Sequence, residues 1–594
     1  MKRRKFLKAT GTSVAAVGMG ILPVGGAQQR SASPAVAVQS EGPASQQVKV
    51  KMRDGVELVG DLYLPGGGGP FPIMMTKSPY PPDRHIQNGK FYSSKGYGVL
   101  IVSQRGRFGS GGIFHQSRNE GWLEHKDGYD AIEWAATQPW STGKIGTFGI
   151  SSDGQWQLSA APTQPPHLRA MFCSYAAHHR DGGRMEHCVH ASTGPTWHHN
   201  NDAMGRPLRR RDDWNRWLAF WKESQLPMLM TLLHPELIEQ FQHTAYDNYW
   251  RDVDPATRYA DFNVPVYHES GWYDRYVRAT FGNFNGIRTH AKSQETRDAQ
   301  KVIMGPWLHG GGVAPETEAV KFAPQAKIDR HALHLRWFDY WLKGIDTGVL
   351  RDPAVRVYLM GAERWLESNT WPLPGIQYVK YYLRRGPAES TKSINDGRLQ
   401  REAPRAETAD EYLHDPYNPV PTIGSHGGFG GIWEPGPRDQ REIEPHLLTY
   451  TTDALEKDVE VVGEVKVRFF ASTSARDADF ILTLTDVFPG GNSALLRQNV
   501  VQVRFRDSEE KESPVTPGKV YELTLLMDGI ANLFKAGHRI RLSIASSSFP
   551  AFFPNPGTGG PLHLVTKAVT ARNAIYHESR YPSAIEIPVR EGAA

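Results

Sequence analysis

The sequence predicts a chain of the α/β class, in which a helical insertion interrupts the α/β domain and an all-β domain follows. Strand and helix patterns alternate over residues 97–175, which indicates a parallel sheet with helices on both faces. Residues 176–255 contain helical segments rich in Trp, Leu and His but no strand pattern. From about residue 353, short alternating strands are separated by turn residues, as is typical of a sandwich or a jelly roll.

The length of the chain supports the same division. A chain of 594 residues is too long for a single core, so two or three domains are expected. We place a signal peptide and linker at 1–46 and the two parts of the α/β domain at 47–175 and 256–352. The helical insertion, expected to form a cap over the site, spans 176–255, and the jelly-roll-like β domain spans 353–594.

The first residues of the chain are typical of an export signal. A basic start at 1–8 is followed by a weakly apolar run at 9–24 and by small residues at 25–27. The Arg3-Arg4 pair resembles a twin-arginine signal. Because the apolar run is short and broken by Gly and Pro, it does not indicate a stable membrane anchor. We therefore expect an exported protein, periplasmic or extracellular.

The distribution of charge limits the classes of binding partner that the sequence predicts. The formal net charge of +5 comes from the signal, which carries five basic residues and no acidic one. The rest of the chain is close to neutral, and its short basic run at 209–211 is followed directly by two aspartates. Neither feature indicates nucleic-acid binding. The sequence leaves the oligomeric state open.

Cysteine usage indicates neither a disulfide framework nor a metal site. Cys173 and Cys188 are the two cysteines of the chain, and whether they pair depends on a distance that the sequence does not contain. Histidines surround Cys188, but their spacing matches no standard zinc pattern. We predict no metal and no cofactor.

The elements of the α/β part follow in order. A hairpin is predicted at 47–64 with its turn at Asp54-Gly55, and the loop at 105–112 is rich in glycine but lacks the ending of a phosphate loop. Further predicted elements are strands at 72–75, 97–102, 144–148, 168–174, 264–269 and 301–304, and helices at 127–137, 212–226, 227–241, 276–286 and 327–343. The predicted strands of the β domain are 355–360, 377–383, 447–452, 465–472, 480–487, 499–504, 521–526 and 539–543.

Residues 144–154 carry the strongest chemical motif. They predict a strand, a tight turn and a helix, with Ser151 at the apex between Gly149 and Gly154. A nucleophile elbow needs this arrangement, because the turn is sharp and its neighbours must be small. The usual Gly-x-Ser-x-Gly is here Gly-x-Ser-x-x-Gly, and taken alone it is equally consistent with an ordinary glycine-serine loop.

An acid and a histidine follow in the order that an α/β-hydrolase requires. Such enzymes place Ser, Asp and His in that chain order, each at the carboxyl end of a strand. Asp274 comes shortly after the predicted strand 264–269, and His309 comes shortly after 301–304. Alone, Asp274 is equally well a helix N-cap and His309 an ordinary loop histidine. All three positions together predict a serine hydrolase.

The motifs at 271–274 and 305–309 are similar to the acid and base motifs of the cocaine esterase (CocE/NonD) family of serine hydrolases. That family also contains α-amino acid ester hydrolases, related acylases and X-prolyl dipeptidyl aminopeptidases. The resemblance covers nearly all of the mature chain, including the hairpin at 54–63, the loop at 105–110 and the stretch 537–555 of the β domain.

The resemblance implies roles for five residues. Ser151 would be the nucleophile, His309 the general base and Asp274 the acid that orients it. Tyr80, in Ser-Pro-Tyr after an early strand, would donate its hydroxyl to the oxyanion hole, and Ser152 would donate its backbone N–H. On the sequence alone, Tyr80 is also consistent with a packed or turn tyrosine.

The chain departs from the family at the elbow and near the acid. The family usually has tyrosine directly after the nucleophile, where this chain has Ser152 followed by Asp153. The sequence leaves open whether Asp153 brings a carboxylate near the site or faces solvent. Arg275 follows the acid, where α-amino ester hydrolases place acidic residues, and a cation there would repel a substrate ammonium. The candidates for substrate binding are Trp272, Tyr273, Arg275, Trp307 and Asp153.

These observations predict an exported serine hydrolase that cleaves small-molecule carboxylic esters through an acyl-enzyme. One alternative is an amide acylase or X-prolyl dipeptidyl peptidase that uses the same three residues. Another is a non-catalytic glycan-binding protein built on the β domain. The sequence does not name the substrate, although Trp197, His198, His199 and Trp217 of the predicted cap are expected to shape the pocket.

Overall fold

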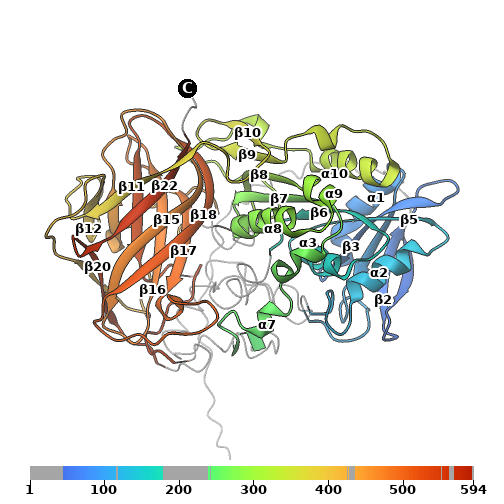
Figure 1. Cartoon of the computed structure of the whole chain (residues 1–594), viewed down its shortest axis with the longest axis horizontal. Helices are drawn as coiled ribbons and strands as arrows, with labels where there is room; N and C mark the ends of the chain where they lie inside the picture. Colours follow the sequence, from blue (N-terminus) through green and yellow to red (C-terminus); the bar gives the residue numbers. More distant parts are fainter. Residues whose placement is uncertain are drawn as a thin grey trace, which may run out of the picture. The chain divides into compact units, whose positions relative to one another are not determined.

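A largely parallel sheet forms the first domain (Figure 1). The computed structural model describes residues 45–115, 118–177, 239–240, 242–424, 426, 435–549, 551–560 and 567–590. In these residues the strand order is β1-β2-β4-β3-β5-β6-β7-β8-β9-β10. The pairs β1–β2, β2–β4 and β9–β10 are antiparallel, and the other neighbouring pairs are parallel. The strands are β1 (Gln46–Lys51), β2 (Glu57–Tyr63), β3 (Phe71–Ser78), β4 (Gly98–Ser103), β5 (Ser141–Ile150), β6 (Leu168–Ser174), β7 (Val266–Tyr273), β8 (Lys301–Leu308), β9 (Val355–Leu359) and β10 (Arg364–Ser368).

Helices cover both faces of this sheet, as the alternating pattern predicts. They include α1 (Ile86–Ser94), α2 (Asp127–Ala136), α3 (Ser152–Ala160), α8 (Val277–His290), α9 (Gln294–Asp298) and α10 (Arg330–Phe338), which continues as a π-helix (Asp339–Lys343). Successive strand side chains point to opposite faces. Ile73 and Met75 of β3 therefore pack with α2, α3 and α8, whereas Met74 packs with α1 and α10.

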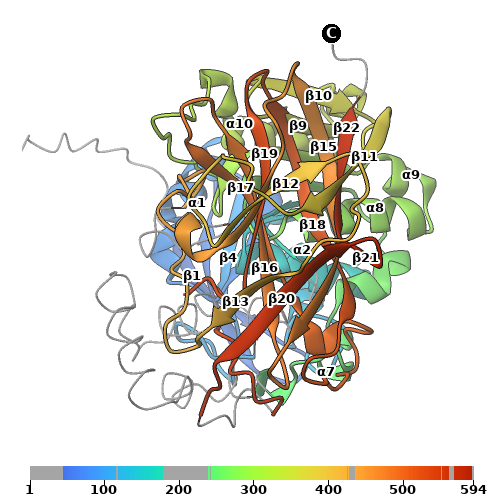
Figure 2. The ribbon, with the colours of Figure 1, turned by 90° about the vertical axis from the view of Figure 1, so that its left-hand side faces the viewer.

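The second domain is a largely antiparallel β structure, as predicted (Figure 2). Among the described residues its main strand order is β13-β20-β15-β22-β11-β12-β14-β19-β16-β17, with β18 paired to β15 and β21 to β20. The pair β12–β14 is parallel. The strands are β11 (Ile376–Arg384), β12 (Asn395–Gln400), β13 (Asp410–His414), β14 (Leu448–Thr451), β15 (Val459–Thr473), β16 (Asp479–Val487), β17 (Ser493–Gln502), β18 (Tyr521–Phe534), β19 (Arg539–Ala545), β20 (Ala571–Glu578), β21 (Tyr581–Pro582) and β22 (Ala584–Arg590).

Backbone hydrogen bonds join the two domains. Met360, which follows β9, accepts a hydrogen bond from Leu533 N at 2.8 Å and donates one to Ala531 O at 3.0 Å. One hydrophobic core also runs through both domains, and it includes Trp272 and Phe281 from the first and Val461 from the second. The β domain is thus packed directly against the part of the first domain that contains β7 and α8.

The structure differs from the predicted boundary at residue 353. Strand β9 pairs in parallel with β8, and β10 pairs with β9, so both belong to the first sheet. The two strands lie at the edge of the first sheet, and edge strands have a short alternating pattern like that of strands in an all-β domain. Helix α1 was not predicted, because Ile86–Ser94 has little apolar periodicity.

The predicted cap at 176–255 falls mainly on residues outside the described part of the chain. From this range the structure describes residues 176–177, 239–240 and 242–255, which include α7 (Asn248–Arg251). The helices predicted at 212–226 and 227–241 also lie outside the described residues, apart from residues 239 and 240. The signal peptide and linker predicted at 1–46 also lie outside the described residues, apart from residues 45 and 46. Among the described helices, none has both the length and the apolar character needed to span a membrane.

Candidate active site

Ser151 lies in a sharp turn between β5 and α3. Its backbone adopts φ 63° and ψ −123°, a region that a residue with a side chain rarely occupies. The Ser151 N–H donates to Ser174 O at 2.9 Å, and the Ser151 carbonyl accepts from the N–H groups of Gly154 and Gln155, both at 2.8 Å. These bonds hold the strained turn in place, so the predicted elbow is present.

The two glycines of the motif are required by close backbone approaches. A Cβ at Gly149 would lie 2.3 Å from Asp153 O, and a Cβ at Gly154 would lie 2.9 Å from the Ala176 Cβ. Gly149 thus makes room for the first turn of α3, and Gly154 makes room for the segment that follows β6. The late second glycine fits this packing, because the tight contact with that segment falls at residue 154.

Asp274 follows β7 directly and is fully buried. Its Oδ1 accepts a hydrogen bond from Tyr276 N at 2.7 Å, and its own N–H donates to Gly271 O at 2.9 Å. Its Oδ2 lies 2.5 Å from Nδ1 of His309. The carboxylate is therefore oriented by the backbone on one oxygen and holds the imidazole with the other.

His309 follows β8, and its ring lies between two tyrosines. The rings of Tyr175 and Tyr276 meet it edge-on, with centroids 5.7 and 5.6 Å away. Its side chain is only 8% exposed. Because Nδ1 faces the Asp274 carboxylate, Nε2 is the nitrogen placed to exchange a proton with a hydroxyl group.

The topology brings the three residues to one edge of the sheet. Strands β5, β6, β7 and β8 are parallel neighbours, so their carboxyl ends lie at the same edge. Ser151, Asp274 and His309 each come directly after one of these strands. Open α/β sheets bind ligands at this edge.

Tyr80 and Ser152 also lie at this edge. Tyr80 comes two residues after β3, which pairs in parallel with β5, and it is 5% exposed. Its N–H donates to Ser78 Oγ at 3.1 Å, and the Arg84 guanidinium lies 4.3 Å from its ring centroid. Ser152 is buried and is the first residue of α3, where backbone N–H groups have no partner within the helix.

Asp153 points into the protein rather than into solvent. It is buried, and its Oδ2 lies 3.2 Å from Nε2 of His85. The same nitrogen of His85 lies 3.3 Å from Ser78 Oγ. Sequence reasoning did not single out His85, since a histidine in a proline-rich loop carries no motif.

Three of the predicted substrate-binding residues pack in the core. The Trp272 indole N–H donates to Tyr358 O at 2.7 Å, and the Trp307 indole N–H donates to Ala326 O at 2.6 Å. Tyr273 is 1% exposed, and burial raises the pKa of its hydroxyl above the ordinary value. The strands run further than predicted, so Trp272 and Tyr273 lie inside β7 and Trp307 lies inside β8.

Arg275 differs from these three. It follows Asp274, it is half-buried, and its guanidinium lies 5.9 Å from the Tyr276 ring centroid. Of the three predicted substrate-binding residues beside Asp274, Arg275 alone is not packed in the core, so its charge can lie near the site.

A buried ion pair supports the tyrosine beside His309. Glu269, in the middle of β7, is fully buried and binds Arg330 of α10, with Arg330 Nη2 2.6 Å from Oε1. The Ser174 hydroxyl donates to Glu269 Oε2 at 2.7 Å, and Tyr175 N donates to Glu269 O at 2.7 Å. No sequence motif marked this group, because it joins residues that are far apart in the chain.

Arg497 of the β domain holds the strand end that carries the acid. Its Nη1 donates to Trp272 O at 2.9 Å and to Asp274 O at 3.1 Å, and its Nη2 binds the Asp528 carboxylate. Arg497 is 1% exposed. The sequence contained no signal for this contact, since it bridges more than 200 residues.

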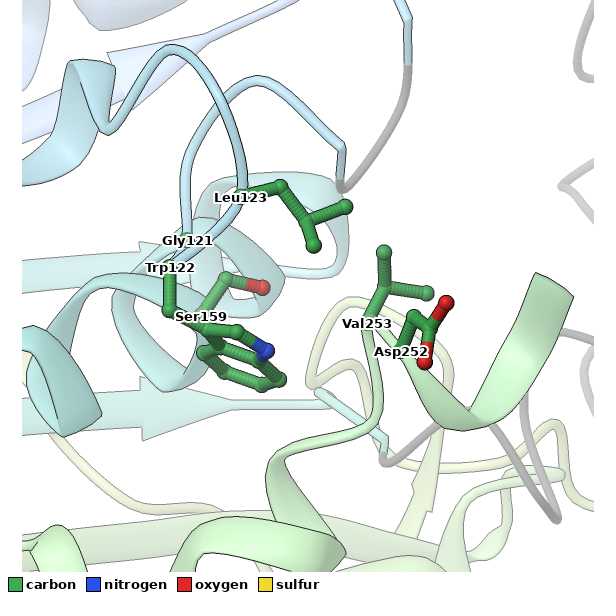
Figure 3. A pocket seen from close by; sticks show the side chains of 6 residues that line it. All are labelled: Gly121, Trp122, Leu123, Ser159, Asp252 and Val253. Carbon is green, nitrogen blue, oxygen red and sulfur yellow. The ribbon is translucent and has the colours of Figure 1, made fainter. Parts of the chain in front are cut away.

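The described residues offer little for a metal or a second ligand near the site. Among them there is no group of three or more His, Cys, Asp or Glu side chains that could hold a metal ion. A narrow hollow, too small to hold a water molecule, lies between the loop at 121–123, Ser159 of α3 and residues 252–253 (Figure 3). It is beside the far end of α3, two turns from Ser151. Cys173 is buried in β6, whereas Cys188 lies outside the described residues.

The fold and the site together define an α/β serine hydrolase with an appended β domain. The family model for X-Pro dipeptidyl-peptidases (S15 family) matches residues 54–311. The model for the C-terminal non-catalytic domain of X-Pro dipeptidyl-peptidases matches residues 347–586. The chain is 30% identical to the cocaine esterase of Rhodococcus sp. (strain MB1 Bresler), over 91% of this chain and 98% of that protein. It belongs to the CocE/NonD family of serine hydrolases.

Other similar proteins also match over nearly the whole length of both chains. A putative serine esterase of Mycobacterium bovis is 26% identical over 94% of this chain and 97% of its own. An α-amino acid ester hydrolase structure superposes with a TM-score of 0.78 at 22% identity, covering 95% of this chain and 99% of its own. An aminopeptidase from a Thaumarchaeota archaeon superposes with the same TM-score at 23% identity, covering 95% and 98%. These structures support the two-domain fold.

Proposed function

We propose that this protein hydrolyses carboxylic esters through an acyl-enzyme on Ser151. The observation that carries the proposal is the 2.5 Å contact between Asp274 Oδ2 and His309 Nδ1, at the sheet edge where Ser151 occupies its strained turn. Nucleophile, base and orienting acid are the parts that a serine hydrolase needs. The 30% identity to a cocaine esterase supports an ester as the substrate.

In the proposed first step, Ser151 Oγ attacks the ester carbonyl while His309 Nε2 takes the hydroxyl proton. Asp274 stabilises the imidazolium that forms and keeps the ring in the required orientation. The Ser152 N–H and the Tyr80 hydroxyl donate hydrogen bonds to the carbonyl oxygen and stabilise the negative charge that develops on it. His309 then gives its proton to the departing alcohol, which leaves the acyl group on Ser151.

In the second step, water replaces the alcohol. His309 accepts a proton from water, the resulting hydroxide attacks the acyl carbonyl, and Ser151 leaves with the proton returned by His309. Two chemically similar half-reactions thus use one base.

A fluorophosphonate probe tests this proposal. Wild-type protein should be labelled covalently at Ser151, and Ser151→Ala should not be labelled. Turnover of p-nitrophenyl esters should disappear with the label. Labelling of Ser151→Ala, or no labelling of the wild type, would overturn the proposal.

Cleavage of an amide bond by the same residues is the second candidate. The S15 family model, named for X-Pro dipeptidyl-peptidases, favours it. Arg275 beside the acid disfavours a substrate with a free ammonium, because like charges repel. Matched ester and amide substrates with the same acyl group separate the two. We expect ester turnover to exceed amide turnover, and the reverse ranking would favour the amide function.

We further propose export by the twin-arginine route. The support is the Arg3-Arg4 pair ahead of a short apolar run. When the full-length chain is expressed in a bacterial host, the protein should appear in the periplasm or medium with its signal removed. Changing both arginines to lysine should keep the enzyme in the cytoplasm, and unchanged export of that variant would contradict the proposal.

A further inference from the structure

A carboxylate–histidine pair lies beside the proposed nucleophile without being part of the Ser–His–Asp set. Asp153 is in the first turn of α3, two residues after Ser151, and His85 ends the short 3₁₀ helix Pro82–His85. Their side chains are 6% and 9% exposed, with Oδ2 of Asp153 3.2 Å from Nε2 of His85. The pair therefore ties the loop after β3 to the helix that begins at the elbow.

The pair reaches Tyr80 through one more residue. His85 Nε2 also lies 3.3 Å from Ser78 Oγ, and this hydroxyl oxygen accepts the Tyr80 N–H at 3.1 Å. The Arg84 guanidinium, next to His85, lies over the Tyr80 ring at 4.3 Å. Both the backbone and the ring of Tyr80 are thus held by groups whose position depends on the segment anchored at Asp153.

Stability alone does not explain the pair. Asp153 Oδ1 and His85 Nδ1 are buried and, within the described part of the chain, have no hydrogen-bond partner. Burying polar groups with incomplete hydrogen bonding costs free energy, and such a pair stabilises a fold poorly compared with apolar packing. What the pair does provide is a fixed relation between two short segments that both contribute to the site.

We infer that Asp153 and His85 are positioning residues for the oxyanion hole. They hold the Tyr80 hydroxyl where it and the Ser152 N–H can both donate to the same substrate oxygen. This inference rests on the proposed esterase function. The Ser152 N–H belongs to α3, whereas the Tyr80 hydroxyl comes from the loop after β3, so the two donors need a link. The side chain of Asp153, one residue after Ser152, supplies that link.

Steady-state kinetics of single and double variants test the inference. Tyr80→Phe should lower kcat by about 100- to 1000-fold, as for loss of one oxyanion donor. Asp153→Ala should lower kcat by about 100-fold with KM little changed, because a small misplacement near the reacting atoms has that effect. The Tyr80→Phe/Asp153→Ala double variant should be within about twofold of Tyr80→Phe, because Asp153 acts through Tyr80.

Histidine variants and a matched control complete the experiment. His85→Gln keeps an N–H donor near the Nε2 position and should retain most of the activity that His85→Ala loses. Glu133→Ala removes a more exposed carboxylate–histidine pair, Glu133 with His167 at 2.6 Å, which lies away from the site because His167 directly precedes β6. It should leave kcat unchanged. Thermal unfolding of each variant shows whether a loss of activity reflects loss of fold.

The outcomes separate the two proposals. If the wild type turns over no ester and takes no fluorophosphonate label, the proposed function falls and the inference falls with it. If the wild type is active but Asp153→Ala retains full kcat, the positioning role alone is wrong. It is also wrong if Asp153→Ala and Tyr80→Phe lower kcat multiplicatively, because independent effects would mean that Asp153 does not act through Tyr80.

Discussion

At the scale of single residues, Ser151 is notable for its backbone. A non-glycine residue at φ 63° and ψ −123° is strained, typically by about 1–3 kcal/mol. Three backbone hydrogen bonds around Ser151 hold this conformation. Such strain persists where the surrounding structure over-determines it, and it gathers at functional sites. The conformation of Ser151 thus supports its proposed role independently of the motif.

Asp274 provides the prediction at this scale. In Asp274→Asn the Tyr276 N–H keeps an acceptor, but the amide no longer stabilises the imidazolium and can impose the wrong tautomer on His309. We expect kcat on esters to fall by about 10³- to 10⁴-fold while KM changes little. Circular dichroism should show an intact fold, and a kcat within tenfold of wild type would contradict the role of Asp274.

At the scale of elements, a buried charged cluster joins several strands of the β domain. His577 of β20 contacts Asp410 of β13 through Nε2 at 2.8 Å and Glu407 through Nδ1 at 3.1 Å. Tyr450 of β14 and Asn395 of β12 also donate to Asp410, at 2.9 and 2.8 Å. Burial lowers the pKa of His577, but the hydrogen bond and charges of the two carboxylates outweigh it and raise the pKa above its ordinary value.

This cluster predicts a pH dependence of stability. Because the pKa of His577 is raised in the folded state, its contribution is full below the unfolded value of about 6.5 and is lost as the pH rises through the folded pKa. The difference in free energy of unfolding between wild type and His577→Gln should therefore shrink between pH 6 and pH 9. Urea unfolding at several pH values measures it, and a constant difference would refute the assignment.

At the scale of the whole molecule, the β domain contributes to the site through Arg497. This side chain donates to the carbonyl of Trp272, near the end of β7, and to that of Asp274, the proposed acid, and it forms an ion pair with Asp528 of its own domain. The domain described in the matching family model as non-catalytic thus holds, through Arg497, the strand end that carries Asp274. Neither domain presents this arrangement alone.

Arg497→Met should therefore affect both stability and catalysis. It leaves the buried Asp528 carboxylate without its partner, which should cost about 3–5 kcal/mol in the free energy of unfolding. Arg497→Met/Asp528→Asn should recover much of that loss but not the ester kcat, because the Trp272 and Asp274 carbonyls still lack their donor. Full recovery of kcat in the double variant would show that Arg497 has no positioning role.

Much of the fold could be predicted because it follows from local patterns. Strand and helix alternation predicted the parallel sheet, and the glycine-flanked serine predicted the elbow, since both depend on residues close in sequence. The predictions were weaker where elements end. Trp272, Tyr273 and Trp307 were expected to contact substrate, yet β7 and β8 continue through them. Gly271 makes this possible, because a Cβ there would lie 2.2 Å from Trp307 O.

The sequence by itself was enough to predict Ser151, Asp274 and His309 as candidates, in that chain order, because each follows a strand whose pattern can be recognised from neighbouring residues. Only the tertiary structure decided which way Asp153 points, what His85 contacts and that Arg497 reaches the acid loop. These contacts join segments between about 70 and 220 residues apart. Such contacts depend on how the strands and domains pack together, and that information is absent from any short stretch of sequence.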